Sequence, residues 1–171
     1  DGMLQLAAVL ERFGRPVSAG IGIISPSGGA IGIAVDRLGD LDLHLAVLDD
    51  GSQARLRRHM NATHAFNPVD LGNRIRSDLD SISGVVEALS MAPDVGILFF
   101  VLTTSPNFEQ VVRQMADAAL AGGKAVLFLV TPGPAADGCR AILSELNVPY
   151  VNRMDDAMRV LKLYLPFARD D

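Results

Sequence analysis

The stretch that decides the fold is Ala19-Gly-Ile-Gly-Ile-Ile-Ser-Pro-Ser-Gly-Gly-Ala-Ile-Gly-Ile33, in which an apolar run leads through a serine and glycine turn into a second apolar segment. The run 19–24 does not alternate with polar residues, which is typical of a strand that helices cover on both faces. In 28–38 the apolar positions recur every three or four residues, which predicts a helix. The stretch therefore predicts a buried strand, a tight turn and a crossover helix.

The same pattern recurs along the rest of the chain. Further apolar runs predict strands at 43–48, 95–102, 125–130 and 148–151. Segments with helical spacing predict helices at 53–60, 78–91, 107–121, 135–146 and 155–165. Strands that alternate with helices form a parallel sheet with helices on both faces, and ligands then bind outside the carboxyl ends of the strands. The strand-to-helix turns are therefore the places to look for a site.

Length and composition limit the function classes. A chain of 171 residues fits one domain, 1–171, and its abrupt start at Asp1, without an initiator Met, suggests a piece of a larger multidomain protein. Fifteen Lys and Arg against 20 Asp and Glu leave no basic footprint for nucleic acid. The single cysteine, Cys139, excludes an internal disulfide. No apolar run reaches the roughly 18 to 20 residues of a membrane span, and the first residues do not have the pattern of a signal peptide, so a soluble chain is expected. The use of a single cysteine is compatible with a reducing compartment, and a cytoplasmic location is expected.

The turn between 25 and 30 is the first candidate site. Its glycines permit close backbone approach, so the N–H groups of Gly28, Gly29 and Ala30 are candidates to bind a phosphate at the positive end of the helix, with Ser25 and Ser27 adding hydroxyl donors. The turn lacks the Gly-Lys-Ser/Thr of a Walker loop and the full dinucleotide fingerprint. The alternative is a serine N-cap with glycines for tight packing. A nucleophilic Ser27 is less favoured, because the hydrolase elbow needs glycine where Ser25 stands.

Two more segments are candidates for the rim of this site. In Phe66-Asn-Pro-Val-Asp-Leu71, the residues Asn67, Pro68 and Asp70 either brace a rigid loop through Asx bonds or border the serine and glycine turn. Thr103 and Thr104 follow the predicted strand 95–102 and belong to the same edge of the sheet. These five residues are the predicted rim.

The three histidines do not predict a metal site. His44, His59 and His64 are fifteen and five residues apart, which matches no ligand pattern. His44 is expected to be half-buried within a strand, and His59 and His64 to face solvent. Arg55, Arg57 and Arg58 are expected to form a solvated helix face. No metal ligand is therefore predicted.

Taken together, several motifs resemble one family. The sequence resembles the C-terminal flavodoxin-like ligase-CoA domain of NDP-forming acyl-CoA synthetases, the superfamily of acetate-CoA ligase and succinyl-CoA synthetase. The segments that carry the resemblance are Ile23–Gly32 with Asp36, Asp50–Leu56, Asn67-Pro-Val-Asp-Leu71, Val95–Leu102, Gly123–Leu127, and Asn147–Val151 leading into Arg153–Val160. The resemblance runs from about residue 8 to 168 and implies a three-layer α/β/α sandwich with a mainly parallel five-stranded sheet.

The resemblance also implies a function. In this family a carboxylic acid, CoA and a nucleoside triphosphate are interconverted with acyl-CoA, nucleoside diphosphate and phosphate through a phosphohistidine. The domain at hand supplies a helix N-terminus that holds the phosphate, which assigns Ser27, Gly28, Gly29 and Ala30 to that role with Ser25 in support. The implied partners are a CoA-binding domain, the domain with the phosphohistidine and an ATP-grasp domain. CoA and ATP with Mg belong to the parent enzyme, and this domain alone is expected to bind no cofactor.

The sequence departs from the family in two places. Pro26 stands where members commonly have Asn or Gln, which removes one backbone donor from the turn. The chain contains no Ser-His-Thr-Gly segment for the phosphorylated histidine, so the isolated domain is expected to be inactive. The alternative is a degenerate, non-catalytic domain that acts as an interaction module. A domain separated from its neighbours often exposes apolar surface, which makes a homodimer a further expected partner.

Overall fold

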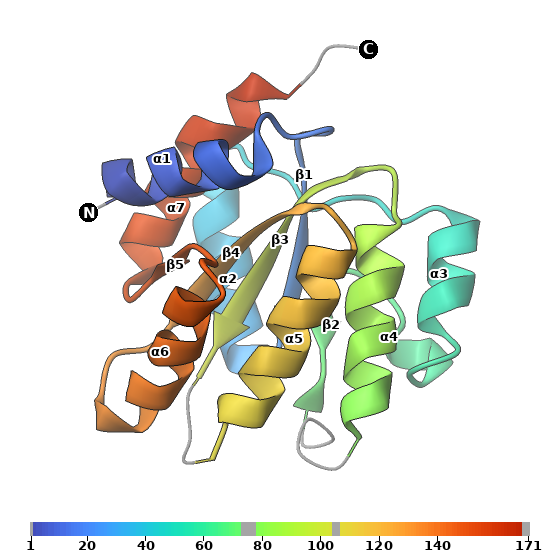
Figure 1. Cartoon of the computed structure of the whole chain (residues 1–171). Helices are drawn as coiled ribbons and strands as arrows, with labels where there is room; N and C mark the ends of the chain where they lie inside the picture. Colours follow the sequence, from blue (N-terminus) through green and yellow to red (C-terminus); the bar gives the residue numbers. More distant parts are fainter. Residues whose placement is uncertain (1, 73–77, 104–106, 169–171) are drawn as a thin grey trace.

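A parallel five-stranded sheet in the order β2-β1-β3-β4-β5 forms the middle layer of the molecule (Figure 1). The computed structural model describes residues 2–72, 78–103 and 107–168. The strands are β1 (Gly20–Ser25), β2 (Val69–Asp70), β3 (Val95–Leu102), β4 (Ala125–Val130) and β5 (Tyr150–Val151). All paired strands are parallel, so the predicted flavodoxin-like α/β/α sandwich with a five-stranded sheet is confirmed.

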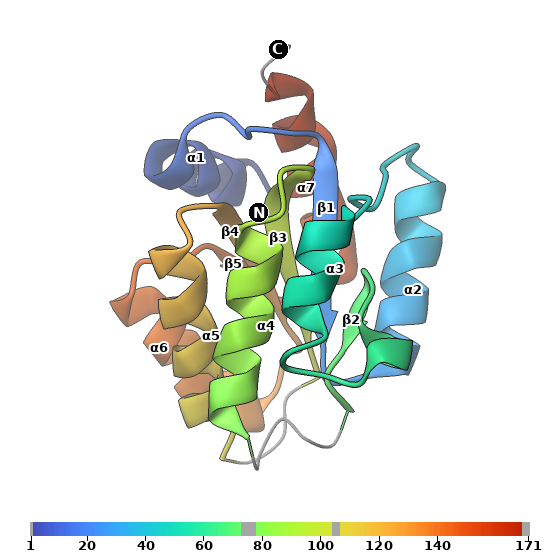
Figure 2. The ribbon, with the colours of Figure 1, turned by 90° about the vertical axis from the view of Figure 1, so that its right-hand side faces the viewer.

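Helices cover both faces of the sheet (Figure 2). On one face lie α3 (Asp50–Leu56), α4 (Leu79–Ser90), α5 (Glu109–Ala121) and α6 (Asp137–Glu145), and on the other lie α1 (Gly2–Phe13), α2 (Gly28–Gly39) and α7 (Met154–Tyr164). Short 3-10 turns are η1 (Ala62–His64), η3 (Pro134–Ala136) and η4 (Leu165–Phe167). No helix within the described residues is long and apolar enough to cross a membrane.

The central strand β3 shows why the apolar runs do not alternate with polar residues. Phe99 packs into the core under α1, α2 and α7, whereas Phe100 packs into the core under α3 to α6, and both are fully buried. Phe100 also stacks on Phe128 of β4, with ring centroids 4.3 Å apart. Because both faces of the sheet are covered, every position of β3 favours an apolar residue.

The prediction of a strand at 43–48 is wrong. This segment makes one isolated parallel bridge, between Leu45 and Ile21, and is otherwise irregular. The Ile21 N–H donates to the carbonyl of His44 at 3.1 Å, and the Ala46 N–H donates to the carbonyl of Ile21 at 2.9 Å. The strand at this edge of β1 is instead β2, within the segment that the sequence placed in a loop.

Asn67 explains why β2 replaces the predicted strand. Its side-chain oxygen accepts a hydrogen bond from the Ile23 N–H at 2.9 Å. Its side-chain nitrogen donates to the carbonyls of Ile21 at 2.8 Å and Ala46 at 3.0 Å. One side chain therefore satisfies three backbone groups along β1 and 43–48, and the ladder continues through β2. Of the Asx bonds predicted for this loop, the one of Asp70 is present, since its carboxylate accepts from the Gly72 N–H, whereas Asn67 bonds to distant backbone instead.

Most predicted helices agree with the structure to within a few residues. The largest shift is at the predicted helix 53–60. Asp49 caps α3, so the helix begins at Asp50, three residues earlier than predicted, and ends at Leu56. A 3-10 turn that begins at Pro134 precedes α6, so α6 begins at Asp137, two residues later than predicted. The N-terminal helix α1 was not predicted, and its buried residues Leu6 and Val9 join the core next to α7.

Candidate functional site

The β1–α2 turn lies at the carboxyl edge of the sheet, where the winding direction of the chain reverses. From β1 the chain crosses to β2 on one side, and it then returns to β3 on the other side of β1. A reversal of this kind leaves a crevice outside the strand ends, which is the usual ligand position in open α/β sheets. The sequence therefore places its serine and glycine turn at the topological switch point.

The first turn of α2 keeps two backbone donors open. Ser27 is the N-cap, with extended backbone angles, and its Oγ accepts from the Ala30 N–H at 3.3 Å. The N–H groups of Gly28 and Gly29 have no hydrogen-bond partner among the described residues, and both glycines are exposed. The helix has no acidic residue in its first turn. Two amides at the positive end of the helix dipole are thus left without a protein acceptor.

Ser25 is occupied inside the protein. It is fully buried, and its hydroxyl donates to the Val101 carbonyl of β3 at 2.7 Å. The same oxygen accepts from the Ser27 N–H at 3.1 Å. Ser25 therefore ties the start of the turn to the neighbouring strand, and it reaches a ligand only through the position that it gives to Ser27.

Asp70 brings a negative charge to the predicted phosphate position. A Cβ added at Gly28 would lie 2.9 Å from Asp70 Oδ2, so the carboxylate packs directly over that glycine. Its other oxygen accepts from the Gly72 N–H at 2.8 Å. A side chain at position 28 would shift the Asp70 carboxylate from this place. The carboxylate also faces the positive end of α2, which favours this arrangement.

The remaining rim residues have separate positions. Pro68 is half-buried and follows Asn67 through a cis peptide bond. Asn67 bonds to the backbone of β1, as described above. The end of its segment contacts the serine and glycine turn: Asp70 packs against Gly28, and the Leu71 N–H donates to the Ser25 carbonyl at 2.9 Å. Thr103 is exposed directly after β3. Thr104 lies outside the described residues.

The histidines differ from the prediction at two positions. His44 is exposed rather than half-buried, because its segment is not a paired strand. His59 is half-buried rather than solvent-facing, since its ring packs against Gly84 of α4, where a Cβ would come within 2.2 Å of it. His64 is exposed, as predicted. Among the described residues no group of three or more His, Cys, Asp and Glu side chains is placed so that it could hold a metal ion.

A nucleophilic Ser27 finds no catalytic base in this arrangement. In the part of the chain that the structure describes, the Ser27 hydroxyl has one hydrogen-bond partner, the Ala30 N–H, and no histidine or carboxylate is bonded to it. A serine nucleophile needs a base within hydrogen-bond reach. The geometry thus favours a capping serine.

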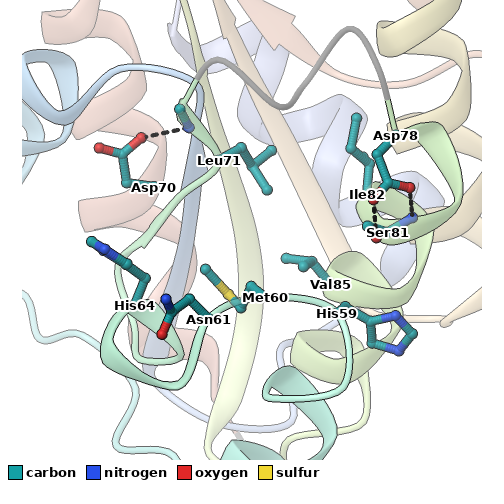
Figure 3. Close-up of a pocket in the computed structure, with 11 residues that line it drawn as sticks. His59, Met60, Asn61, His64, Asp70, Leu71, Asp78, Ser81, Ile82 and Val85 are labelled. Atoms are coloured by element: carbon teal, nitrogen blue, oxygen red, sulfur yellow. Dashed lines mark hydrogen bonds between the residues drawn. The ribbon is translucent and has the colours of Figure 1, made fainter.

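A cavity that the sequence did not predict lies beside the turn, between η1 and β2 on one side and the N-terminal half of α4 on the other (Figure 3). Its volume is about 300 Å³. It is lined by His59, Met60, Asn61, His64, Asp70, Leu71, Gly72, Asp78, Ser81, Ile82 and Val85. The cavity depends on the approach of η1 to α4 across β2, a strand of two residues for which the sequence contains no periodic signal.

These observations define a class of protein fold, an α/β domain with a parallel five-stranded sheet and a helix N-terminus open at its switch point. Solved structures with this fold include the protein PH0766 from Pyrococcus horikoshii OT3, at a TM-score of 0.77 and 20% identity. They also include the dinucleotide forming acetyl-coenzyme A synthetase 1 of Ca. Korarchaeum cryptofilum, in complex with phosphate and ADP and in its apo form, both at a TM-score of 0.80 and 16% identity.

The structural similarity covers nearly the whole of this chain but less than half of each of these solved structures. It spans 98% of this chain and 39% of the Pyrococcus protein. For the two synthetase structures it spans 97% of this chain and 36% and 37% of theirs. At these identities the likeness shows a shared fold. No protein-family model and no curated protein matches the sequence.

Proposed function

We propose that this chain is an accessory domain of an NDP-forming acyl-CoA synthetase, and that the first turn of α2 holds the phosphoryl group of a phosphohistidine carried by a neighbouring domain. The parent enzyme would interconvert acid, CoA and nucleoside triphosphate with acyl-CoA, nucleoside diphosphate and phosphate. The observation that carries the proposal is the pair of open, exposed amides at Gly28 and Gly29. The fold shared with an acetyl-coenzyme A synthetase supports it.

The chemistry of the turn suits a phosphoryl oxygen. Backbone N–H groups at a helix N-terminus donate to anions without a charged side chain. Pro26 contributes no N–H, and the Ser27 N–H is already bonded to Ser25. Binding therefore falls to Gly28 and Gly29, with Ala30 available if its long 3.3 Å bond to Ser27 Oγ opens.

Asp70 determines which anion fits best. Its carboxylate, packed over Gly28, repels a fully deprotonated anion. A phosphate oxygen that keeps a proton can instead donate a hydrogen bond to this carboxylate, and such charge-assisted bonds are strong. Inorganic phosphate carries a proton near neutral pH, whereas sulfate does not. The turn should therefore bind phosphate in preference to sulfate.

The second candidate is a non-catalytic domain that binds partner domains. It is favoured by the same Asp70 carboxylate, because an aspartate that already faces the positive end of α2 makes an external anion unnecessary. The absence of a Ser-His-Thr-Gly segment from this chain fits both candidates, since the phosphohistidine of the first would be carried by another domain. Anion binding at the turn separates the two.

The test is a titration of the chain with inorganic phosphate, followed by ¹H–¹⁵N NMR. We expect saturable shifts at the amides of Gly28, Gly29 and Ala30, with a dissociation constant on the order of 1 mM, as for a small exposed anion site. Sulfate should shift them less. Shifts confined to other parts of the chain would overturn the phosphoryl role and leave the interaction module.

Two matched variants sharpen this test. Gly29→Glu places a carboxylate in the first turn, where it stabilises the helix and competes with phosphate; a Cβ there meets only Ser27 Oγ, at 3.9 Å. Gly32→Glu adds the same charge one turn further along, where a Cβ meets open space. We expect Gly29→Glu to weaken phosphate binding at least tenfold and Gly32→Glu to change it less than threefold. Equal effects would indicate a general charge effect.

A further inference from the structure

We propose that the edge of the sheet beside the first half of β1, at residues 43–48, binds an extended segment of a partner protein that is apolar at its centre and basic at both ends. The partner segment would add a strand to the sheet. This inference does not rest on the proposed function, because the turn of α2 follows the other end of β1. Figure 2 looks onto this edge, and the chain that leads from α2 to α3 lies between these two helices.

The backbone of Leu45 is turned away from β1. Leu45 pairs with Ile21 in an isolated parallel bridge. The Ile21 N–H donates to the His44 carbonyl, and the Ala46 N–H donates to the Ile21 carbonyl. In such a pair the residue between these two directs its own N–H and carbonyl to the opposite side. Neither group of Leu45 has a hydrogen-bond partner among the described residues, so both are open to an added strand.

The residues two positions away on either side add open carbonyls to this row. The Leu43 N–H donates to the Leu38 carbonyl at 3.0 Å, and the Val47 N–H donates to Asp94 Oδ2 at 2.7 Å. The carbonyls of Leu43 and Val47 accept no hydrogen bond within the part of the chain that the structure describes. The edge therefore offers one donor and three acceptors, which suit the N–H groups of an extended backbone.

The segment 43–48 lacks the features that usually protect the edge of a sheet. Proteins block such edges with prolines, charged side chains or very short strands. The half of this edge formed by β2 has all three, because β2 is two residues long, contains Asp70 and follows Pro68. Leu43-His-Leu-Ala-Val-Leu48 contains no proline and no charged Lys, Arg, Asp or Glu. Its Val47 side chain is 79% exposed, so a partner strand has apolar surface to cover.

The charges around the segment indicate a basic partner. No lysine or arginine lies in 38–54, and four exposed aspartates flank the apolar segment: Asp40 and Asp42 before it, Asp49 and Asp50 after it. From other elements, Asp94 adds a carboxylate, and Arg55 of α3 acts on Asp49. Asp42 and Asp50 make no ion pair among the described residues. Basic residues at the two ends of an extended segment would meet these carboxylates.

The same charges disfavour a second copy of this chain as the occupant. If 43–48 paired with itself in the antiparallel sense about Leu45, Asp40 would lie opposite Asp50 of the second copy. Asp42 would then lie next to Asp49 of the second copy. A parallel pairing in register would place each aspartate beside its equivalent. Like charges on neighbouring strands are destabilising, so a segment with basic ends is the occupant that charge favours.

The experiment is an NMR titration of the chain with the synthetic peptide acetyl-Lys-Lys-Val-Thr-Val-Thr-Val-Lys-Lys-amide. We expect saturable shifts at the amides of Leu45, Ala46 and Val47, and slower hydrogen exchange at Leu45. The dissociation constant should be on the order of 1 mM, because few groups contribute and the peptide is ordered on binding.

Two comparator peptides separate charge from backbone pairing. The peptide with Glu in place of Lys should bind at least about tenfold more weakly, since it meets like charge. The peptide N-methylated at its five central residues lacks the N–H donors, and it should also bind at least about tenfold more weakly. A lack of shifts at the three amides, or equal binding of all three peptides, would overturn the proposal.

Two pairs of variants test the position of the site. Val47→Lys adds a charged side chain at an exposed edge position and should weaken the basic peptide at least about tenfold. Leu4→Lys is its control, because Leu4 is exposed on α1, which packs beside β4 and β5. Asp42→Asn, whose φ of 55° asparagine also adopts, should weaken the peptide about threefold. Asp117→Asn, at an exposed acid of α5, is its control.

The two controls should leave binding of the basic peptide unchanged. Equal effects of Val47→Lys and Leu4→Lys would overturn the edge as the binding site. Equal effects of Asp42→Asn and Asp117→Asn would overturn the assignment of a basic partner. These results are independent of phosphate binding at Gly28 and Gly29, so either proposal can fail while the other stands.

Discussion

Two helices begin at the same edge of the sheet, and their first turns are built differently. Helix α4 carries its own negative charges: the N-cap Asp78 accepts from the Ser81 N–H at 3.0 Å and from its hydroxyl at 2.5 Å, and Asp80 follows in the first turn. Helix α2 has the neutral cap Ser27 and no acid in its first turn. The helix dipole of α4 is compensated locally, whereas that of α2 depends on Asp70 from another strand or on a bound anion.

The difference indicates which helix end is structural and which is available for binding. The cap of α4 uses a charged acceptor at short distances, and its first turn has the sequence of an ordinary helix start. In α2 two glycines take the place of helix-forming residues, at a cost to helix stability. An anion bound to the open amides of Gly28 and Gly29 would offset that cost in helix stability.

The largest expected effect comes from removing the residue that holds the β2 segment, and Asp70 with it, beside α2. Asn67→Ala removes one acceptor and two donor contacts at 2.8 to 3.0 Å. It takes the Asn67 partner from the Ile23 N–H and the Ala46 carbonyl, whereas the Ile21 carbonyl keeps its bond from the Ala46 N–H. We expect the free energy of unfolding to fall by about 3 kcal/mol, since unsatisfied buried backbone groups are costly.

Chemical denaturation of both proteins measures this change. Hydrogen exchange at the Ile23 amide gives the local readout, and it should accelerate more than exchange at Phe100 in the centre of the sheet. A loss below about 1 kcal/mol would mean that water or β2 itself replaces the Asn67 bonds.

The next effect tests the N-cap of α4, the helix that carries acidic residues at its own N-terminus. Asp78→Ala removes the N-cap acceptor of α4 and should lower the free energy of unfolding by about 1.5 kcal/mol. Asp78→Asn keeps an oxygen for the Ser81 N–H and should recover most of this loss. Thermal unfolding of the three proteins provides the comparison. If Asn and Ala cost the same, the charge rather than the capping bond stabilises α4.

A smaller effect tests the negative charge that Asp70 of β2 places beside the N-terminus of α2. Asp70→Asn removes the negative charge over Gly28, and at about 4 Å in water such a charge is worth about 1 kcal/mol. Sulfate binding at the turn should therefore tighten about fivefold, and the preference for phosphate over sulfate should narrow. Asp36→Asn is the matched control, because Asp36 is an exposed acid on the same helix beyond its first turn. Unchanged sulfate affinity in Asp70→Asn would show that the carboxylate does not face the anion.

The sequence allowed the sandwich and most helices to be predicted, because burial on both faces produces long apolar runs such as Val95–Leu102. It misplaced one strand, since Leu43–Leu48 has the same apolar pattern although it makes a single bridge. What excludes it from the sheet is one side chain, Asn67, that bonds to β1 from a distant loop. Apolar patterns do not contain that information.

The candidate site could be predicted in part for a similar reason. The Ser27-Gly-Gly turn has a local sequence signature, so its place at a helix N-terminus followed from the sequence. The contact of Asp70 with Gly28 and the cavity beside it depend on β2, a strand of two residues that is too short for any periodic signal. The sequence predicts a ligand-facing hydroxyl at Ser25, whereas the structure buries this residue because it pairs with Asp70 at the end of β1.

The smallest expected effect completes the comparison of the two caps. Ser27→Ala removes a neutral acceptor whose bond to the Ala30 N–H is long, 3.3 Å, in a half-exposed turn where water can replace it. We expect a loss of about 0.5 kcal/mol in thermal unfolding, about a third of that for Asp78→Ala. In saturating phosphate the loss should shrink further, because the bound anion supplies an acceptor for Ala30. A loss as large as that of Asp78→Ala would make Ser27 a structural cap of the same kind, and the open turn of α2 would then have no special role.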